Sequence, residues 1–156
     1  MDLLDFDENG LLKPYDVILS DLPTFKDVFV EKIALSQTRK ALFESYLRYL
    51  ETIRSVIPSD FYQWIDGSFV TKKQNPNDID VVTFINYQDF ERNLKAFDML
   101  RKWRFDRKMG IDGYFVPIFP ENHRKYSNFT IEQREWLFLF SKDRHKNNKG
   151  IIQISF

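Results

Sequence analysis

Two neighbouring stretches decide the fold of this chain: Trp64-Ile65-Asp66-Gly67-Ser68-Phe69 and Asp78-Ile79-Asp80-Val81-Val82-Thr83-Phe84-Ile85. The first stretch is mostly apolar up to a Gly-Ser pair. The second is rich in β-branched residues and carries acids only at its start. Both patterns are typical of strands bounded by turn residues. We therefore predict strands over 61–66 and 78–85, with a sharp turn after the first of them.

The second stretch begins with two acids, Asp78 and Asp80, on either side of Ile79. Side chains alternate between the faces of a sheet, so both carboxylates should project from the same face. Two such carboxylates repel each other, a divalent cation relieves the repulsion, and Mg²⁺ prefers oxygen ligands. Acidic pairs also occur on solvated strand ends, so this pair alone is weak evidence for a site.

A Gly-Ser pair precedes the acids, with nine residues between Ser68 and Asp78. Glycine allows a sharp turn and the close approach of a ligand. Backbone amides after such a turn form a concavity that binds anions, and the Ser68 hydroxyl adds a donor. A phosphate cradle that faces two carboxylates is what triphosphate chemistry requires. The alternative is an ordinary turn that ends a strand.

A third acid, Asp112, interrupts the apolar run Gly110-Ile111-Asp112-Gly113-Tyr114-Phe115-Val116, which predicts a strand over 111–119. A carboxylate in an apolar strand is costly unless it is paired, lies at an exposed end or binds a metal. If this strand lies beside the 78–85 strand, Asp112 completes a set of three acids at one sheet edge.

The rest of the chain predicts helices packed on a small sheet, an α/β (α+β) fold in one domain over 1–156. Residues 1–23 contain turn signals and should form an extended or turning arm. The further elements expected are a short helix opened by a capping box at Thr24, a long helix from Ser36 to Ile57, a helix from Asn86 with Phe90, Leu94, Phe97 and Leu100 or Met99 on its buried side, a helix opened by a second capping box at Thr130, and a strand over 150–156.

Composition excludes several classes of function. The 23 basic and 23 acidic side chains cancel, which argues against general DNA binding. The chain has no cysteine, so disulfides, thiolate catalysis and cysteine-ligated zinc are excluded. We expect the two histidines, His123 and His145, at the surface. Without a signal peptide or a long apolar run, the expected location is the cytoplasm, with no membrane partner.

The Gly-Ser pair, the Asp-x-Asp pair and the later single Asp together resemble the DNA polymerase beta-type minimal nucleotidyltransferase superfamily. Trp64-Ile65-Asp66-Gly67-Ser68-Phe69-Val70-Thr71 and Pro76-Asn77-Asp78-Ile79-Asp80-Val81-Val82 resemble a small, poorly characterised bacterial branch of it. The start Phe6-Asp7-Glu8-Asn9-Gly10-Leu11-Leu12 and the tail Lys142-Asp143-Arg144 with Lys149-Gly150-Ile151-Ile152 also resemble this branch. The resemblance implies a nucleotidyltransferase fold over nearly the whole chain.

The resemblance also implies a reaction: transfer of a nucleoside monophosphate from an NTP, with ATP favoured, to a protein or RNA acceptor with release of pyrophosphate. Asp78, Asp80 and Asp112 would be the catalytic residues and the ligands of two Mg²⁺ ions, with Mn²⁺ as a substitute. Gly67 and Ser68 would hold the β- and γ-phosphates. Lys72, in the loop between cradle and acids, and Arg144 and Lys149, in the resembling tail, would neutralise the triphosphate, although basic loops are more often simply solvated.

Two other functions remain open at this stage. Small relatives act in bacterial toxin–antitoxin or defence systems, so the acceptor could be a cognate toxin or antitoxin, by analogy of fold alone. A non-catalytic module that binds a nucleotide or a partner, antitoxin-like, is the main alternative. A chain that neutralises its partner by covering it, with the acids incidental, is the third.

Overall fold

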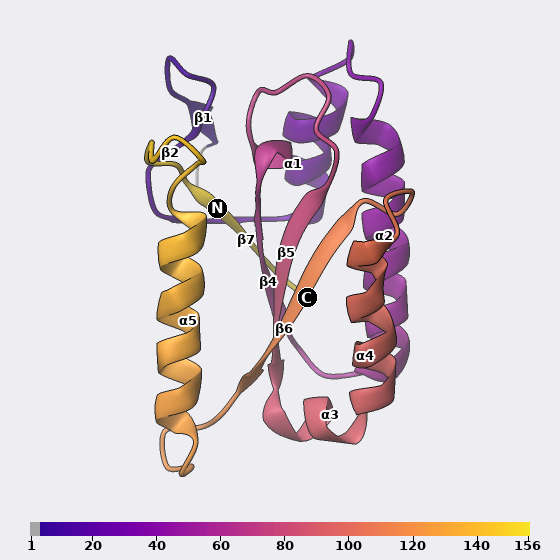
Figure 1. The fold of residues 1–156 in the computed structure, drawn as a ribbon, viewed down its shortest axis with the longest axis vertical. Helices are drawn as coiled ribbons and strands as arrows, with labels where there is room; N and C mark the ends of the chain where they lie inside the picture. Colours follow the sequence, from indigo (N-terminus) through magenta and orange to yellow (C-terminus); the bar gives the residue numbers. More distant parts are fainter. Residues whose placement is uncertain (1–3) are drawn as a thin grey trace.

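The computed structural model describes residues 4–156 and contains a mixed five-stranded sheet with helices on both faces (Figure 1). The strand order is β3-β7-β4-β5-β6. β3 and β7 are parallel, β7–β4 and β4–β5 are antiparallel, and β5 and β6 are parallel. This confirms the predicted α/β (α+β) class.

All four predicted strands are present, and the sheet has a fifth that the sequence did not predict. The main strands are β3 (Val17–Ser20), β4 (Tyr62–Asp66), β5 (Ile79–Asn86), β6 (Ile111–Ile118) and β7 (Ile151–Ser155), and a separate hairpin joins β1 (Asp5–Phe6) to β2 (Leu12–Lys13). The predicted arm is therefore wrong for β3, which is an edge strand. Residues 1–3 of that arm lie outside the described residues.

The helices correct several predicted boundaries. They are α1 (Leu22–Lys26), which continues as a π-helix (Asp27–Glu31), α2 (Arg39–Val56), α3 (Tyr87–Arg92), α4 (Leu94–Arg101) and α5 (Tyr126–Phe140), with short 3-10 helices at Ser68–Val70 and Lys102–Phe105. The helix expected from Asn86 is broken at Asn93 into α3 and α4. Leu94 and Met99 are consequently exposed, while Phe97 and Leu100 are buried.

Both predicted capping boxes are wrong. Asp21, not Thr24, caps α1, because its Oδ1 accepts the N–H of Thr24 at 2.8 Å. α5 already begins at Tyr126, so Thr130 lies inside it and its hydroxyl donates to Ser127 O. Packing of Phe129 against the sheet favours the extra turn, which a local capping motif cannot reveal.

The sheet separates two apolar cores. The larger core lies under α1, α2 and α4 and includes Ile65, Ile79 and Val81. The smaller core lies under α5 and includes Trp64 and Val82. Figure 1 shows α5 alone on one side of the sheet and α2 and α4 on the other. Even-numbered residues of β4 and β5 therefore face α5, which fixes the face on which the acids lie.

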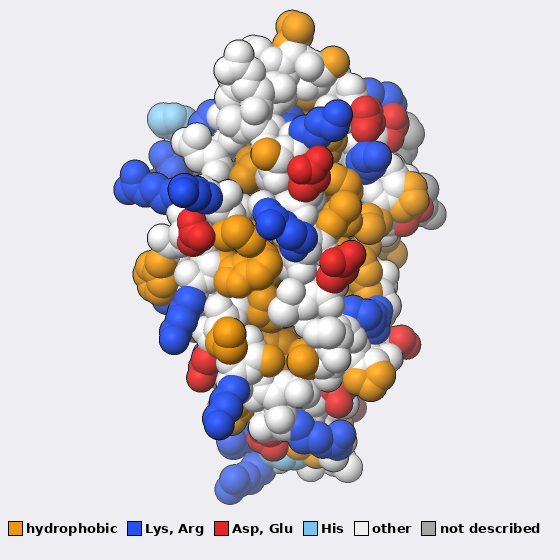
Figure 2. All heavy atoms as spheres, turned by 90° about the vertical axis from the view of Figure 1, so that its right-hand side faces the viewer, with side chains coloured by type: hydrophobic (Ala, Val, Ile, Leu, Met, Phe, Trp, Pro, Cys, Tyr) orange, Lys and Arg blue, Asp and Glu red, His pale blue; other side chains and the backbone are white. Residues whose placement is uncertain are grey.

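The outer face of α2 and α4 carries no single-sign charge field. Figure 2 shows basic and acidic side chains interspersed with apolar ones on this side of the molecule. None of the helices within residues 4–156 has the length and apolar character needed to cross a membrane.

Candidate functional site

Three acids form a row across the sheet at the edge where β4 ends and β5 and β6 begin. Asp66 is the register partner of Asp80, and Asp80 is the register partner of Asp112. Residues paired in this way on neighbouring strands point to the same face, about 4.8 Å apart between strands. Asp78 lies two residues before Asp80 and therefore projects towards the same side. The fold thus gathers four carboxylates on the α5 face of one sheet edge.

Gly67 turns the chain beside this row. Its φ is +80°, and a Cβ at this position would collide with the carboxylate of Asp80. Glycine is therefore required both for the left-handed backbone and for the close approach to Asp80. The turn leads directly into the 3-10 helix Ser68–Val70.

The acids line a cleft of about 600 Å³ between the sheet edge, the C-terminal end of α5 and the loop that follows α5. This volume lies within the range of small-molecule pockets. The lining includes Gly67, Ser68, Asp78, Asp80, Asp112, Arg144 and Lys149 from the sequence-based predictions, together with Asp66, Thr71, Lys73, Tyr114, Trp136, Lys142, Asp143 and His145. Among the residues expected at the site, Lys72 does not line this cleft.

Lys149 is buried in the cleft wall rather than extended into solvent. Its Nζ lies 2.6 Å from Asp66 Oδ1, and the two side chains are 5% and 4% exposed. The ammonium also lowers the pKa of Asp80. Lys149 is therefore ion-paired with a carboxylate of the acid row and supplies a positive charge in the cleft wall.

The acids shift one another's pKa values. Burial raises the pKa of Asp80 to about 7, and the charges of Asp78 and Asp112 add to this effect. Desolvation and the charge of Asp112 also raise the pKa of Asp78, whereas Arg144 and Lys73 lower it. Clustered acids with such shifts are characteristic of functional sites. The cleft favours a cationic group or a proton near Asp80.

Arg39 holds the loop 68–73 from the other face of the sheet. It is 1% exposed and donates to the carbonyl oxygens of Phe29, Phe69, Thr71 and Lys73 at 2.6–3.1 Å. Its guanidinium also lies 4.9 Å from the ring centroid of Phe69. Burial lowers its pKa to about 10. These carbonyl groups point towards Arg39. In a trans peptide the N–H of the next residue points opposite to the carbonyl, so the N–H groups that follow these carbonyls point away from Arg39.

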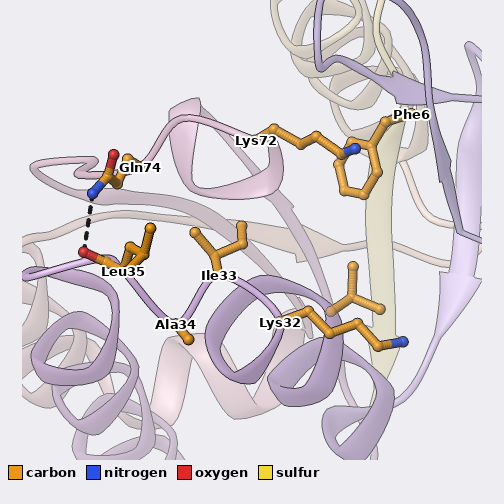
Figure 3. A pocket seen from close by; sticks show the side chains of 8 residues that line it. Phe6, Lys32, Ile33, Ala34, Leu35, Lys72 and Gln74 are labelled. Atoms are coloured by element: carbon orange, nitrogen blue, oxygen red, sulfur yellow. Dashed lines mark hydrogen bonds between the residues drawn. The ribbon is translucent and has the colours of Figure 1, made fainter.

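Lys72 lies in a separate pocket of about 540 Å³, lined mostly by apolar side chains (Figure 3). Its Nζ lies 5.2 Å from the ring centroid of Phe6, and its N–H donates to Gly10 O. The neighbouring Lys73 lines the cleft instead. Adjacent residues of an extended loop point to opposite sides, so sequence proximity to the cradle could not choose between the two lysines.

Several cleft residues carried no local signal. The strand pattern alone does not assign Asp66 to the site, and its register with Asp80 places it in the row. His145 was expected at the surface; it is exposed and also lines the cleft. Tyr114 and Trp136, whose ring centroids are 4.7 Å apart, form an aromatic part of the wall. These contacts depend on where α5 and its following loop pack.

The carboxylates are not drawn together as a ready-made metal site. Within the described part of the chain, no group of three or more His, Cys, Asp or Glu side chains is arranged to hold a metal ion. The donor chemistry of Asp78, Asp80 and Asp112 nevertheless fits Mg²⁺, because all of these ligands are carboxylate oxygens, and burial together with the neighbouring acids raises the pKa values of Asp78 and Asp80.

Residues 4–155 match a protein family described as "Family of unknown function (DUF6932)". The chain belongs to this family. No curated protein and no solved structure matches it. The family description names no activity, so the function of this DUF6932 chain has to be argued from the cleft.

Proposed function

We propose that this chain is a nucleotidyltransferase, adenylyltransferase-like, that transfers a nucleoside monophosphate from an NTP to a protein or RNA acceptor. The observation that carries the proposal is the convergence of Asp78, Asp80 and Asp112 with the Gly67-Ser68 turn in one cleft. Arg144 lines the same cleft and lowers the pKa of Asp78. Acids, a candidate phosphate cradle and a basic group are the parts that triphosphate chemistry requires.

The reaction balances as a single displacement. An oxygen of the acceptor forms a bond to the α-phosphorus of the NTP. The bond from that phosphorus to the bridging oxygen breaks, and pyrophosphate leaves with the electron pair. The acceptor's proton passes to a carboxylate, and we assign this role to Asp112. The Gly67-Ser68 turn would hold the leaving phosphates, and Lys73 and Arg144 would neutralise them.

Asp78, Asp80 and Asp112 are also the residues that would hold Mg²⁺, as two ions, or Mn²⁺ in its place. Such ions supply charge stabilisation for the attacking and leaving oxygens. Their binding would also relieve the repulsion that raises the pKa values of Asp78 and Asp80.

The setting of the reaction is part of the proposal and rests on the resemblance alone. A bacterial toxin–antitoxin or defence system would supply the acceptor as a cognate toxin or antitoxin. We favour ATP as the donor on the same ground.

The test incubates the protein with each α-labelled NTP, Mg²⁺ and host lysate, and then identifies what becomes labelled. Wild type should label an acceptor, with ATP as the best donor, and Asp80→Asn and Asp112→Asn should each abolish labelling. Asp98→Asn is the matched control, because Asp98 is an exposed acid on α4 outside the cleft. Equal labelling by wild type and the two cleft variants would refute the proposal.

One observation favours a second candidate, a non-catalytic module that binds a nucleotide or a partner. The Lys149 ammonium already compensates part of the acid row. On this alternative, ATP would raise the melting temperature of the protein without any labelled product. Neutralisation of a partner that survives alanine at both Asp78 and Asp80 would instead indicate simple covering of the partner's surface.

A further inference from the structure

The outward face of α5 carries an apolar stripe that none of the described residues 4–156 covers. Ile131 and Phe138 are 54% and 70% exposed, and Arg134 and Glu135 lie between them. The steps of three and four residues place all four on one side of the helix. These residues, with Leu139, line a shallow hollow. The opposite side of α5, with Phe129 and Phe140, packs on the sheet.

The stripe is complementary to itself. Ile131 and Phe138 are equally distant in sequence from the point midway between Arg134 and Glu135. If two α5 helices pack antiparallel about a two-fold axis at that point, Ile131 of each copy meets Phe138 of the other. Arg134 of each copy then meets Glu135 of the other. Across residues 4–156 neither Arg134 nor Glu135 has an ion-pair partner.

We propose that α5 pairs with α5 of a second copy of this chain to form a two-fold dimer. An isologous interface uses the same patch on both copies, and this patch has the required symmetry of charge and apolar side chains. A single helix stripe is smaller than the roughly 800 Å² per partner of a standard interface. The dimer should therefore be weak, and the monomer should predominate at low protein concentration. The proposal does not depend on the proposed function.

The dimer would lie beside the cleft. Leu139 lines both the hollow on α5 and the cleft that contains the acids. The second copy would therefore flank the mouth of each cleft, where an acceptor has to enter.

Sedimentation velocity over a wide range of protein concentrations tests the proposal. Wild type should pass from monomer to dimer, and Phe138→Glu should remain a monomer. Arg134→Glu and Glu135→Arg alone should each weaken the dimer at least tenfold, because each places like charges opposite one another. The double variant Arg134→Glu/Glu135→Arg should regain association, because a two-fold pair restores complementarity. Met99→Glu, at an exposed apolar position on α4, should leave the dimer unchanged.

A cross-link tests the register. The chain has no cysteine, so introduced thiols can pair only with each other. A mixture of Ile131→Cys and Phe138→Cys proteins should form mixed disulfides in preference to either protein alone, because like positions in an antiparallel pair are offset by about 10 Å. A monomer at every concentration would overturn the proposal. Failure of the double charge reversal to restore association would overturn it too, and would indicate a partner with a different sequence.

Discussion

The two faces of the sheet each place a buried cation next to the Gly67 turn, and the two cations have different partners. On the α2 face, the Arg39 guanidinium donates to carbonyl oxygens of Phe29 and the loop 68–73 and lies over the Phe69 ring. On the α5 face, the Lys149 ammonium meets the carboxylate of Asp66 in the acid row. Arg39 contacts fixed dipoles, whereas Lys149 contacts a group that titrates.

Because their partners differ, the two cations have different roles: Arg39 supports the loop 68–73, whereas Lys149 lies beside acids whose charge can change. Carbonyl dipoles do not titrate, so the contacts of Arg39 with the loop 68–73 should persist at any pH below its own pKa of about 10. The acid row can gain a proton, a cation or a ligand, so the surroundings of Lys149 can change. One turn is therefore fixed from one face and open to chemical change on the other, as a binding site on a rigid scaffold requires.

The largest expected effect on stability comes from replacing Arg39, which supports the loop 68–73. Arg39→Met leaves at least four carbonyl groups without their donor, three of them in the loop 69–73, and each unsatisfied buried group costs about 1–3 kcal/mol. We expect the free energy of unfolding to fall by about 4 kcal/mol or more, as measured by urea denaturation. Arg39→Lys, with fewer donors, should lie between this variant and wild type.

The control for Arg39 is Arg48→Met on the same helix. Arg48 is exposed, and its guanidinium donates to the hydroxyl of Ser45 at 3.3 Å. Its replacement should change the free energy of unfolding by less than about 0.5 kcal/mol. If the two variants lose equal stability, Arg39 is not the support of the loop.

The next effect concerns Lys149. Lys149→Met leaves the Asp66 carboxylate buried without its counter-charge, which costs about 3–5 kcal/mol when the acid is ionised. Burial already raises the pKa of Asp66, and loss of the ammonium should raise it further. The loss of stability should therefore be full above that pKa and shrink as pH falls and Asp66 takes up a proton.

Thermal denaturation of Lys149→Met from pH 5 to pH 8 measures this dependence. Lys142→Met is the matched control, because Lys142 lies in the same loop and its ammonium contacts the exposed Asn148. A loss of stability that does not depend on pH would contradict a charge pair between Lys149 and Asp66.

A smaller effect, on nucleotide affinity, tests the role of Ser68 separately from that of the acids. If the Ser68 hydroxyl donates to a phosphate, Ser68→Ala should weaken the binding of Mg²⁺·ATP by about 1.5–3 kcal/mol, one hydrogen bond to a charged group. Calorimetry would then show a Kd increase of roughly 10- to 150-fold. The exposed Ser127→Ala on α5 should bind as wild type does. Unchanged affinity in Ser68→Ala would remove Ser68 from the cradle.

The sequence predicted those parts of the fold and site that depend on short-range pattern. Period-two alternation places Asp78 and Asp80 on one face, and the turn chemistry of Gly67 follows from the residue itself. Asp112 required one further assumption, that its strand lies beside β5, and the register confirms that neighbourhood.

The remaining parts depend on contacts between distant segments. Arg39 binds carbonyls about 30 residues away, and carbonyl acceptors leave no trace in side-chain sequence. β3 is only four residues long and pairs with β7 at the other end of the chain. Lys149 was expected to reach phosphate directly, whereas its position before β7 places it against Asp66. Such pairings cannot be derived from local propensity.

The last prediction is that removing a proposed catalytic acid stabilises the protein without ligand. In the fold, the pKa of Asp80 is raised from 3.8 to about 7. The folded protein therefore binds more protons than the unfolded chain between about pH 4 and pH 7, so stability falls as pH rises through this window. Asp80→Asn removes a charge that is disfavoured by burial and by the neighbouring acids Asp78 and Asp112. We expect it to raise the free energy of unfolding by about 1–2 kcal/mol at pH 8 and to have little effect near pH 4.

The same variant should lose the stabilisation that Mg²⁺ and ATP give to wild type, because the acid that repels its neighbours is the acid that would bind the cation. Thermal shifts of both proteins, with and without Mg²⁺ and ATP, measure the two effects together. Asp98→Asn, outside the cleft, should show neither effect. If Asp80→Asn is less stable than wild type at pH 8, Asp80 contributes favourable structural contacts, and the burial and repulsion of its charge do not dominate at this edge of the sheet.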